Sequence, residues 1–196
     1  MGFCVYWLDR LAWGTDPCSV TNLALASKIG LSLGTTQAIV NILLLIIVFI
    51  KDRNEIGLGT VFNMFLVGYS YNLTGFVMDK LGVDYHFPKV SFDSAFDAGN
   101  FMWNLMWMII LLFVFVVAVS VYMSVELGSA PYDAMSRIVH KLQKRLSFKV
   151  VRIIWDGAFA LTGFLLGGTV GVVTVLMAFA IGPMISFMEK RIKRFL

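Results

Sequence analysis

Asp156 and Arg152 have the spacing in this sequence that points most directly to chemistry. They lie four positions apart, which on a helix brings opposite charges onto one face. An ionisable group within an apolar helix marks a binding or proton-transfer site, or a charge with a local partner. Two interpretations therefore stay open: a structural ion pair, or a role for Asp156 in handling a substrate or proton.

A second group of candidate residues begins two short segments. Asp16 precedes Pro17, and Ser129 lies near Pro131, so each segment begins with a capping residue and a proline suited to a first helical turn. Helix N-termini attract anions and half-helices can line a pathway, although capping alone explains Asp16. The candidate pathway residues here are Asp16, Ser19, Asn22, Pro131, Tyr132 and Asp133.

Sequence signals for catalysis or metal binding are missing. The two cysteines, Cys4 and Cys18, have neither metal-ligand nor redox-motif spacing, and His86 and His140 are isolated. The sequence contains no nucleophile elbow, zinc-protease, Walker or dinucleotide motif. We therefore expect no enzyme, no cofactor and no metal.

The composition indicates that lipid is the solvent of the chain. Of its 196 residues, 59% are hydrophobic and 14% are charged, against roughly 45–50% and 25% in soluble domains. The net charge of +4 does not predict a nucleic-acid partner, because such a partner requires an accessible basic face. The bilayer is the first expected partner.

Long uncharged stretches position these residues on membrane spans of about 20 residues each. They lie between Lys28 and Lys51, Glu55 and Asp79, and Asp97 and Glu126; the stretch from Asp156 to Glu189 is long enough for a hairpin turning at 167–169. With a short first helix, the expected spans are 1–13, 34–51, 57–79, 99–126, 148–166 and 170–189.

The basic residues predict the orientation. On one side of this arrangement lie 12 of the 16 lysines and arginines. By the positive-inside rule that side is cytoplasmic, which predicts a multi-pass protein with both termini inside.

An internal repeat relates the two halves. Gly14-Thr15-Asp16-Pro17 matches Gly128-Ser129-Ala130-Pro131, and 56–61 matches 170–175, at an offset of 114 or 115. Each unit holds three spans, so the second copy must be inverted, as in many secondary transporters. We expect an all-α membrane protein of about six transmembrane helices, in one domain, 1–196. It comprises a first repeat (1–83), an extracytoplasmic loop (84–97) and an inverted second repeat (98–196), each repeat with a short interfacial or re-entrant helix.

The repeat also pairs polar residues. Asn41 corresponds to Asp156 and Gln37 to Arg152, so both halves carry polar groups at one depth. Such groups suit a central site between the halves, to which we add Asn63, and they equally suit interhelical hydrogen bonds.

Residues 128–147 form an amphipathic segment. Met135, Ile138, Val139, Leu142 and Leu146 make an apolar stripe at helical spacing. The remaining faces are basic and are expected to contact anionic lipid headgroups through Arg137, Lys141, Lys144 and Arg145.

Several motifs resemble the YczE/YyaS/YitT group of bacterial integral membrane proteins, with the YczE branch the most similar. They are 128–134, 170–174 and 181–183, with related patterns at 14–20 and 56–60. The resemblance implies a multi-span protein of the bacterial cell membrane and transfers no substrate or catalytic residue.

These observations predict a small secondary transporter or permease of an unknown solute. Six spans enclose little volume, so a homodimer is compatible with this function. The alternative is a membrane accessory or regulatory protein that recruits a cytoplasmic partner through the basic segment 137–152.

Overall fold

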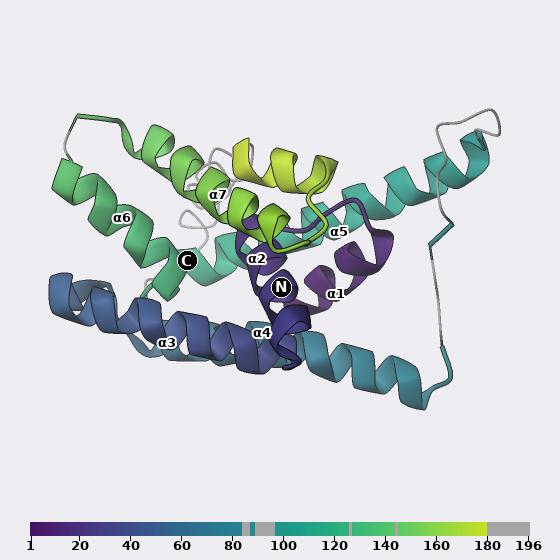
Figure 1. Cartoon of the computed structure of the whole chain (residues 1–196), viewed down its shortest axis with the longest axis horizontal. Coiled ribbons are helices and arrows are strands. Elements are labelled where there is room, and N and C mark those ends of the chain that lie inside the picture. The colour runs from purple at the N-terminus through teal and green to yellow at the C-terminus, as the bar shows by residue number, and fades with distance from the viewer. Residues whose placement is uncertain (84–86, 89–96, 126, 144, 180–196) are drawn as a thin grey trace.

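The chain is helical throughout the part that the computed structural model describes, which is residues 1–83, 87–88, 97–125, 127–143 and 145–179 (Figure 1). These residues contain no strand. The helices are α1 (Gly2–Leu11), α2 (Pro17–Ile29), α3 (Leu33–Lys51), the 3-10 turn η1 (Arg53–Glu55), α4 (Leu58–Lys80), α5 (Ala98–Ser124), α6 (Pro131–Gln143) and α7 (Phe148–Leu165). Residues 172–179 are also helical.

Side-chain caps and glycines set the helix ends. The Ser19 N–H donates to the Asp16 carboxylate at 3.0 Å, and Pro17 occupies the first turn, so the predicted cap of α2 is confirmed. Gly30 ends α2 with φ 70°, in the left-handed region that favours glycine. Gly167 has φ 89° in the predicted turn after α7. The described helix ends agree with the expected spans to within about three residues.

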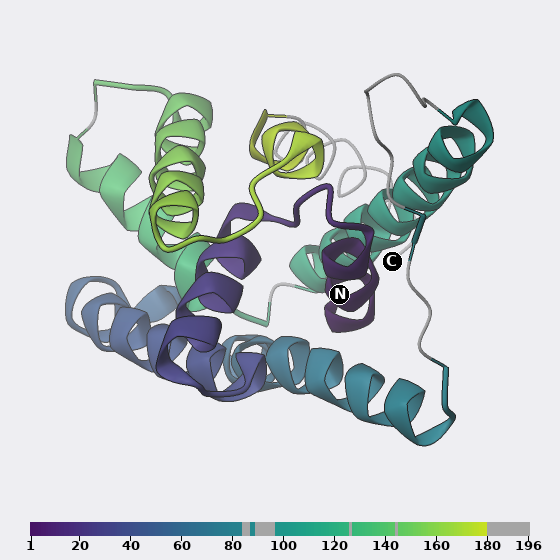
Figure 2. The same cartoon turned by 45° about the vertical axis from the view of Figure 1, so that its right-hand side comes forward.

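The helices form two packed pairs with α2 between them. α3 packs along α4, and α6 packs against α7, while α2 lies between them in contact with α3 and α7 (Figures 1 and 2). α1 contacts α4 and α5. The amphipathic segment is therefore not peripheral, because α6 packs on α3 through Ala134 and Ile138 around Val48.

The largest buried cluster surrounds α1. Leu8 is fully buried, and Val5 packs with residues of α5 and of 172–179, such as Phe115 and Met177. Burial of one such side chain stabilises the fold by about 1.5–3 kcal/mol. This packing holds α1 inside the bundle although it is only 10 residues long.

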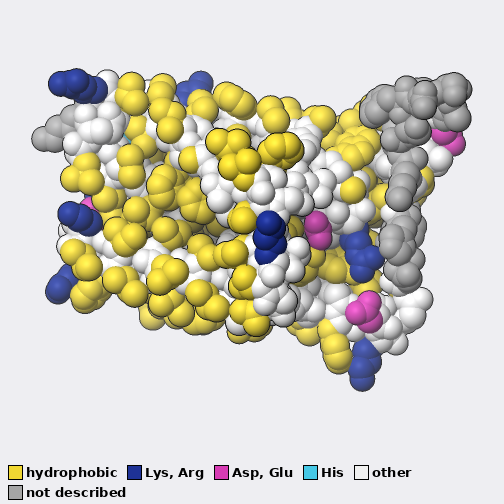
Figure 3. Space-filling model, in the orientation of Figure 1, with side chains coloured by type: hydrophobic (Ala, Val, Ile, Leu, Met, Phe, Trp, Pro, Cys, Tyr) yellow, Lys and Arg dark blue, Asp and Glu magenta, His cyan; other side chains and the backbone are white. Residues whose placement is uncertain are grey.

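The outer faces of the long helices are apolar. α3 exposes Leu43 and Ile50, and α4 and α5 expose Phe62 and Phe113 to a similar extent, as the hydrophobic surface in Figure 3 illustrates. Two helices in the described residues, α3 and α5, are long and apolar enough to cross a membrane. α7 carries three charged residues and α4 many polar ones, which lowers their hydropathy.

Two backbone contacts join the halves at equivalent positions. The Gly59 N–H donates to the Leu127 carbonyl at 2.8 Å, and the Val173 N–H donates to the Trp13 carbonyl at 3.0 Å. The donors are 114 residues apart, and so are the acceptors. Each broken segment is thus bound to the start of a helix in the other half.

Glycines make these contacts possible. Gly14 and Gly128 have φ of 92° and 101°, and a Cβ atom on Gly128 would lie 2.4 Å from the Gly57 nitrogen. A Cβ on Gly14 would lie 2.4 Å from the Thr174 hydroxyl. Both positions therefore require glycine, for conformation and for space.

The structure differs from the sequence predictions at the end of the amphipathic segment, and some predicted features lie outside the described residues. Of the predicted apolar stripe in the segment 128–147, Ile138 on α6 is buried, but Leu142 and Leu146 are 69% and 43% exposed, and Leu146 lies after the end of α6. These two lie beyond the part of the segment that packs against α3. Lys144, most of the loop 84–97 and the end of the span 170–189 lie outside the described residues.

Candidate functional site

A cavity of about 260 Å³ lies where the two halves meet. α2 and α6 both begin at its wall, and α1, α3, α4, α5 and α7 complete it. Its polar lining consists of Asp16, Cys18, Ser19, Gln37, Asn41, Asn63, Tyr122, Tyr132, Asp133, Arg137, Arg152 and Asp156.

Arg152 is the centre of the charged part of this cavity. Its guanidinium lies 3.1 Å from Asp156, as the i,i+4 spacing predicts, and it also binds Asp133 at the start of α6. The Tyr132 hydroxyl donates to the other oxygen of Asp156 at 2.5 Å. The local ion pair is therefore confirmed, within a network that joins α6 to α7.

Carboxamide side chains from α3 and α4 line a second part of the cavity. Gln37 and Asn41 are 6% and 3% exposed, and the Gln37 Oε1 has no hydrogen-bond partner. Asn63 is half-buried, and its amide nitrogen lies 3.7 Å from the Met1 sulfur. A buried amide oxygen without a partner leaves hydrogen-bonding capacity for a bound molecule.

The start of α2 contributes Asp16, Cys18 and Ser19. Asp16 accepts the capping hydrogen bond from Ser19. Its charge and that of Asp133 are close enough to interact, and Cys18 lies within electrostatic range of both. The α2 and α6 starts thus face a common space from opposite halves of the sequence.

The structure brings together nine of the eleven candidate residues. They are Asp16, Ser19, Gln37, Asn41, Asn63, Tyr132, Asp133, Arg152 and Asp156. Asn22 and Pro131 do not line the cavity: Asn22 is fully buried behind it, with its amide 3.4 Å from the Cys18 sulfur, and Pro131 is buried in the first turn of α6.

Sequence reasoning missed Cys18 and the apolar walls. Cys18 directly follows the Asp16-Pro17 start, so its place in the first turn of α2 was a usable signal. The apolar wall residues carry no distinguishing signal in the sequence, because apolar residues also fill the packing and outward-facing positions of the same helices. They include Val5, Val67, Phe115, Val119, Met123, Phe148 and Met177.

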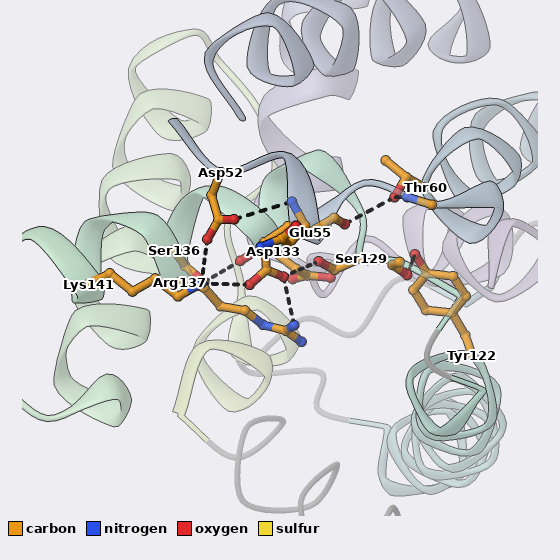
Figure 4. Close-up of polar contacts among 12 residues, drawn as sticks. Asp52, Glu55, Thr60, Tyr122, Ser129, Asp133, Ser136, Arg137 and Lys141 are labelled. Carbon is orange, nitrogen blue, oxygen red and sulfur yellow. Dashed lines mark hydrogen bonds and ion pairs between the residues drawn. The ribbon is translucent and has the colours of Figure 1, made fainter. Parts of the chain in front are cut away.

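A separate polar cluster joins the segment after α3 to α6 (Figure 4). Glu55 accepts hydrogen bonds from Ser129 at 2.9 Å and from Arg137 at 3.0 Å. Lys141 contacts Glu55 at 3.2 Å and also binds Asp52. Two of the basic residues expected to contact lipid headgroups therefore have carboxylate partners within the chain, whereas Arg145 is exposed.

The charges of this cluster stabilise one another. The hydrogen bond from Lys141 lowers the pKa of Asp52, and hydrogen bonds to Asp52 and Glu55 raise the pKa of Lys141. Burial opposes ionisation of Glu55, but Ser129, Arg137 and Lys141 together lower its pKa. All three groups are thus held in their charged forms.

The cluster also borders the central cavity. A second cavity, of about 330 Å³, is lined by Glu55, Ser129 and neighbouring residues. Tyr122, Met123 and Arg137 line both cavities. The Arg137–Glu55 ion pair therefore lies where the two spaces approach each other.

The lining of the central cavity is suited to binding a small molecule. The described residues contain no group of three or more histidine, cysteine or acidic side chains placed to hold a metal ion. Carboxylates, carboxamides and a guanidinium face an otherwise apolar space, which is the usual make-up of a small-molecule pocket.

Comparison with known proteins identifies a family. Residues 1–190 match the model of a family of unknown function, DUF6198. An uncharacterized protein of Haemophilus influenzae is 40% identical to this chain over 76 residues. The aligned part is 38% of this chain and 34% of the relative, so the chain spans about a third of the relative's length. No solved structure matches the chain. Because the match covers nearly the whole sequence, the chain belongs to the DUF6198 family.

Proposed function

We propose that this protein is a multi-pass membrane transporter or permease for a small solute, built from two inverted three-helix repeats. The observation that carries the proposal is the cavity between the halves, lined by the starts of both broken segments, α2 and α6. Interrupted helices at corresponding positions, meeting at a central site, are typical of inverted-repeat transporters.

Two further observations support a repeat in a membrane. The Gly59–Leu127 and Val173–Trp13 hydrogen bonds occupy positions one repeat apart, as a two-fold relation between the halves requires. The broad exposed apolar surface of α3, α4 and α5 is suited to lipid rather than water. The bacterial inner membrane, cytoplasmic termini and kinship with the YczE/YyaS/YitT group remain predictions.

The accessory function has less structural support. It requires the basic residues of α6 to be available to a cytoplasmic partner or to headgroups. Arg137 and Lys141 instead bind Glu55 and Asp52. A partner would have to compete with these carboxylates.

Transport is tested with the purified chain in liposomes. We expect uptake of at least one solute from a panel of small cations, anions and neutral compounds. Asp156→Asn should reduce that uptake, because Asp156 lines the cavity, whereas Asp79→Asn should not, because Asp79 is exposed at the end of α4. Absence of uptake across the whole panel would contradict the proposal.

Membrane topology is tested separately by cysteine labelling in a Cys4→Ala, Cys18→Ala background. An impermeant maleimide should label Val83→Cys in intact cells, because Val83 is exposed after α4, and Arg145→Cys only after permeabilisation. Labelling of both from the same side would contradict the predicted spans.

A further inference from the structure

The charged residues of the central cavity do not balance. Asp16, Asp133 and Asp156 contribute three carboxylates, and Arg152 contributes one guanidinium. Arg137 also reaches the cavity, but Glu55 matches its charge at 3.0 Å. Counted together with Glu55, which lies just outside the lining, these six groups carry a formal charge of −2.

The helix ends reduce this excess without removing it. α2 and α6 are each 13 residues long and begin at the cavity. Each N-terminus is equivalent to roughly +0.5 elementary charge, so the two together offset about one of the two negative charges. An excess of about one negative charge remains, which a monovalent cation would neutralise.

An anion is a poor fit to the same space. Asp16 already occupies the N-terminus of α2, and Asp133 lies in the first turn of α6. Arg152 is engaged by Asp133 and Asp156 together. Neither helix dipole nor guanidinium is therefore left for an anionic group.

Asp16 is the carboxylate without a cationic partner. Its carboxylate accepts a 3.0 Å hydrogen bond from the Ser19 N–H, and within the described residues no lysine, arginine or histidine forms an ion pair with it. Gln37 also lines the cavity; its side chain is nine-tenths buried, and its Oε1 has no hydrogen-bond donor. Both groups are hydrogen-bond acceptors. An ammonium group complements them, because it offers N–H donors or a positive charge and no acceptor.

The remaining lining favours an organic cation over an inorganic one. Phe115, Val119 and Met177 supply an apolar wall. The Tyr132 ring near the carboxylates already has the Arg152 guanidinium over it, 5.2 Å from the ring centroid. The apolar wall suits the carbon body of an organic cation, whereas a sodium or potassium ion would make no favourable contact with it. A volume of about 260 Å³ holds roughly nine water-sized groups at liquid density.

We infer that the central cavity binds a small monovalent organic cation, with its ammonium group at Asp16 and its apolar body against Phe115 and Met177. This inference rests on the proposed function for the identity of the site as a transport site. Binding itself requires no transport and is measured independently.

The test uses three molecules of similar shape and different charge. Choline is the cation, 3,3-dimethyl-1-butanol is its neutral counterpart and 3,3-dimethylbutanoate is an anion. Binding to the purified full chain in detergent is measured by titration calorimetry. We expect choline to bind at least about tenfold more tightly than either of the others, a difference of about 1.4 kcal/mol, because only choline places a positive charge beside Asp16.

Asp16→Asn should abolish this preference while the chain stays folded, because Asn caps helices as well as Asp does. Asp97→Asn is the matched control: Asp97 caps α5 through Gly99 and Asn100 and does not line the cavity. Three results would overturn the inference. The first is that the alcohol or the carboxylate binds as tightly as choline or more tightly, and the second is that sodium binds and choline does not. The third is that Asp16→Asn leaves the preference for choline unchanged.

Liposome uptake separates this inference from the proposed function. Transport of an anionic or neutral solute without choline binding would contradict the cation site and leave the transport proposal standing. Choline binding without uptake of any solute would contradict the transport proposal and leave the cation site standing.

Discussion

Gly59 donates its backbone N–H to the carbonyl of Leu127 at 2.8 Å, which binds the start of α4 to the segment that follows α5. Val173 and Trp13 make the same contact, at 3.0 Å, one repeat away. These contacts hold the two broken segments in place, and the cavity is formed by the helices that those segments begin. The site therefore requires glycine at these junctions, where the two halves pack closely.

We predict that Gly128→Ala and Gly14→Ala destabilise the protein to a similar extent. The left-handed φ alone costs about 1–2 kcal/mol for alanine. The clash of the new Cβ with Gly57 or Thr174 adds about 1–3 kcal/mol. Thermal unfolding in detergent measures the loss. Gly30→Ala is the control, because its φ is 70° but no atom lies within 4 Å of a Cβ there; equal losses at all three glycines would contradict the close contacts.

Arg152→Gln should lower the free energy of unfolding by about 3 kcal/mol. The substitution leaves Asp133 and Asp156 without their shared cation, and an uncompensated buried charge is costly. Lys149→Gln on the exposed face of α7 should change it by less than about 0.5 kcal/mol. Adding Asp156→Asn to Arg152→Gln should restore part of the loss. If Arg152→Gln proved as mild as Lys149→Gln, the network would not contribute to stability.

Glu55→Gln should make the central cavity more accessible from the side of the second cavity. Loss of the Arg137–Glu55 charge pair weakens the contact by about 1 kcal/mol, which corresponds to about a fivefold change in an opening equilibrium. Cys18 lines the central cavity, so its rate of maleimide labelling in a Cys4→Ala background reports the opening. Asp79→Asn should leave the rate unchanged. A rate that Glu55→Gln does not alter would show that this ion pair does not restrict access.

The same cluster predicts a pH dependence. The pKa values of Asp52 and Glu55 are lowered in the folded state, so their contribution is complete above the ordinary values of 3.8 and 4.5 and is lost as pH falls through the folded values. The pKa of Lys141 is raised, so its contribution is complete below 10.5 and is lost as pH rises further. The stability difference between wild type and Glu55→Gln should therefore be constant near pH 7 and shrink below about pH 4. A difference that grows on acidification would contradict the pairing.

The helices were largely predictable because local signals fix them. Asp16, Ser32 and Asp97 cap helices through their own side chains, and apolar stretches of fixed length extend between those caps. The Arg152–Asp156 pair was predictable for the same reason, because four residues on one helix define its geometry.

The candidate site was predictable where the repeat carried information. Matching Asn41 with Asp156 predicted polar groups of both halves at one depth, and in the structure both residues line the central cavity. Asn22 follows the same helical segment as Ser19, but the rotation of α2 against α3 and α7 turns it away from the cavity. Helix rotation depends on side-chain packing between elements, which periodicity along one helix does not specify.

The sequence by itself determined the helical elements, their caps, the apolar surface and the correspondence between the two halves, since each depends on residues close together or on self-similarity. Only the tertiary structure decided that Arg137 and Lys141 bind Glu55 and Asp52, and that Arg152 serves Asp133 as well as Asp156. Arg137 and Glu55 are 82 residues apart. The partner of a charge at that separation is chosen by how whole helices pack, and the free energy of that choice is distributed over the entire bundle.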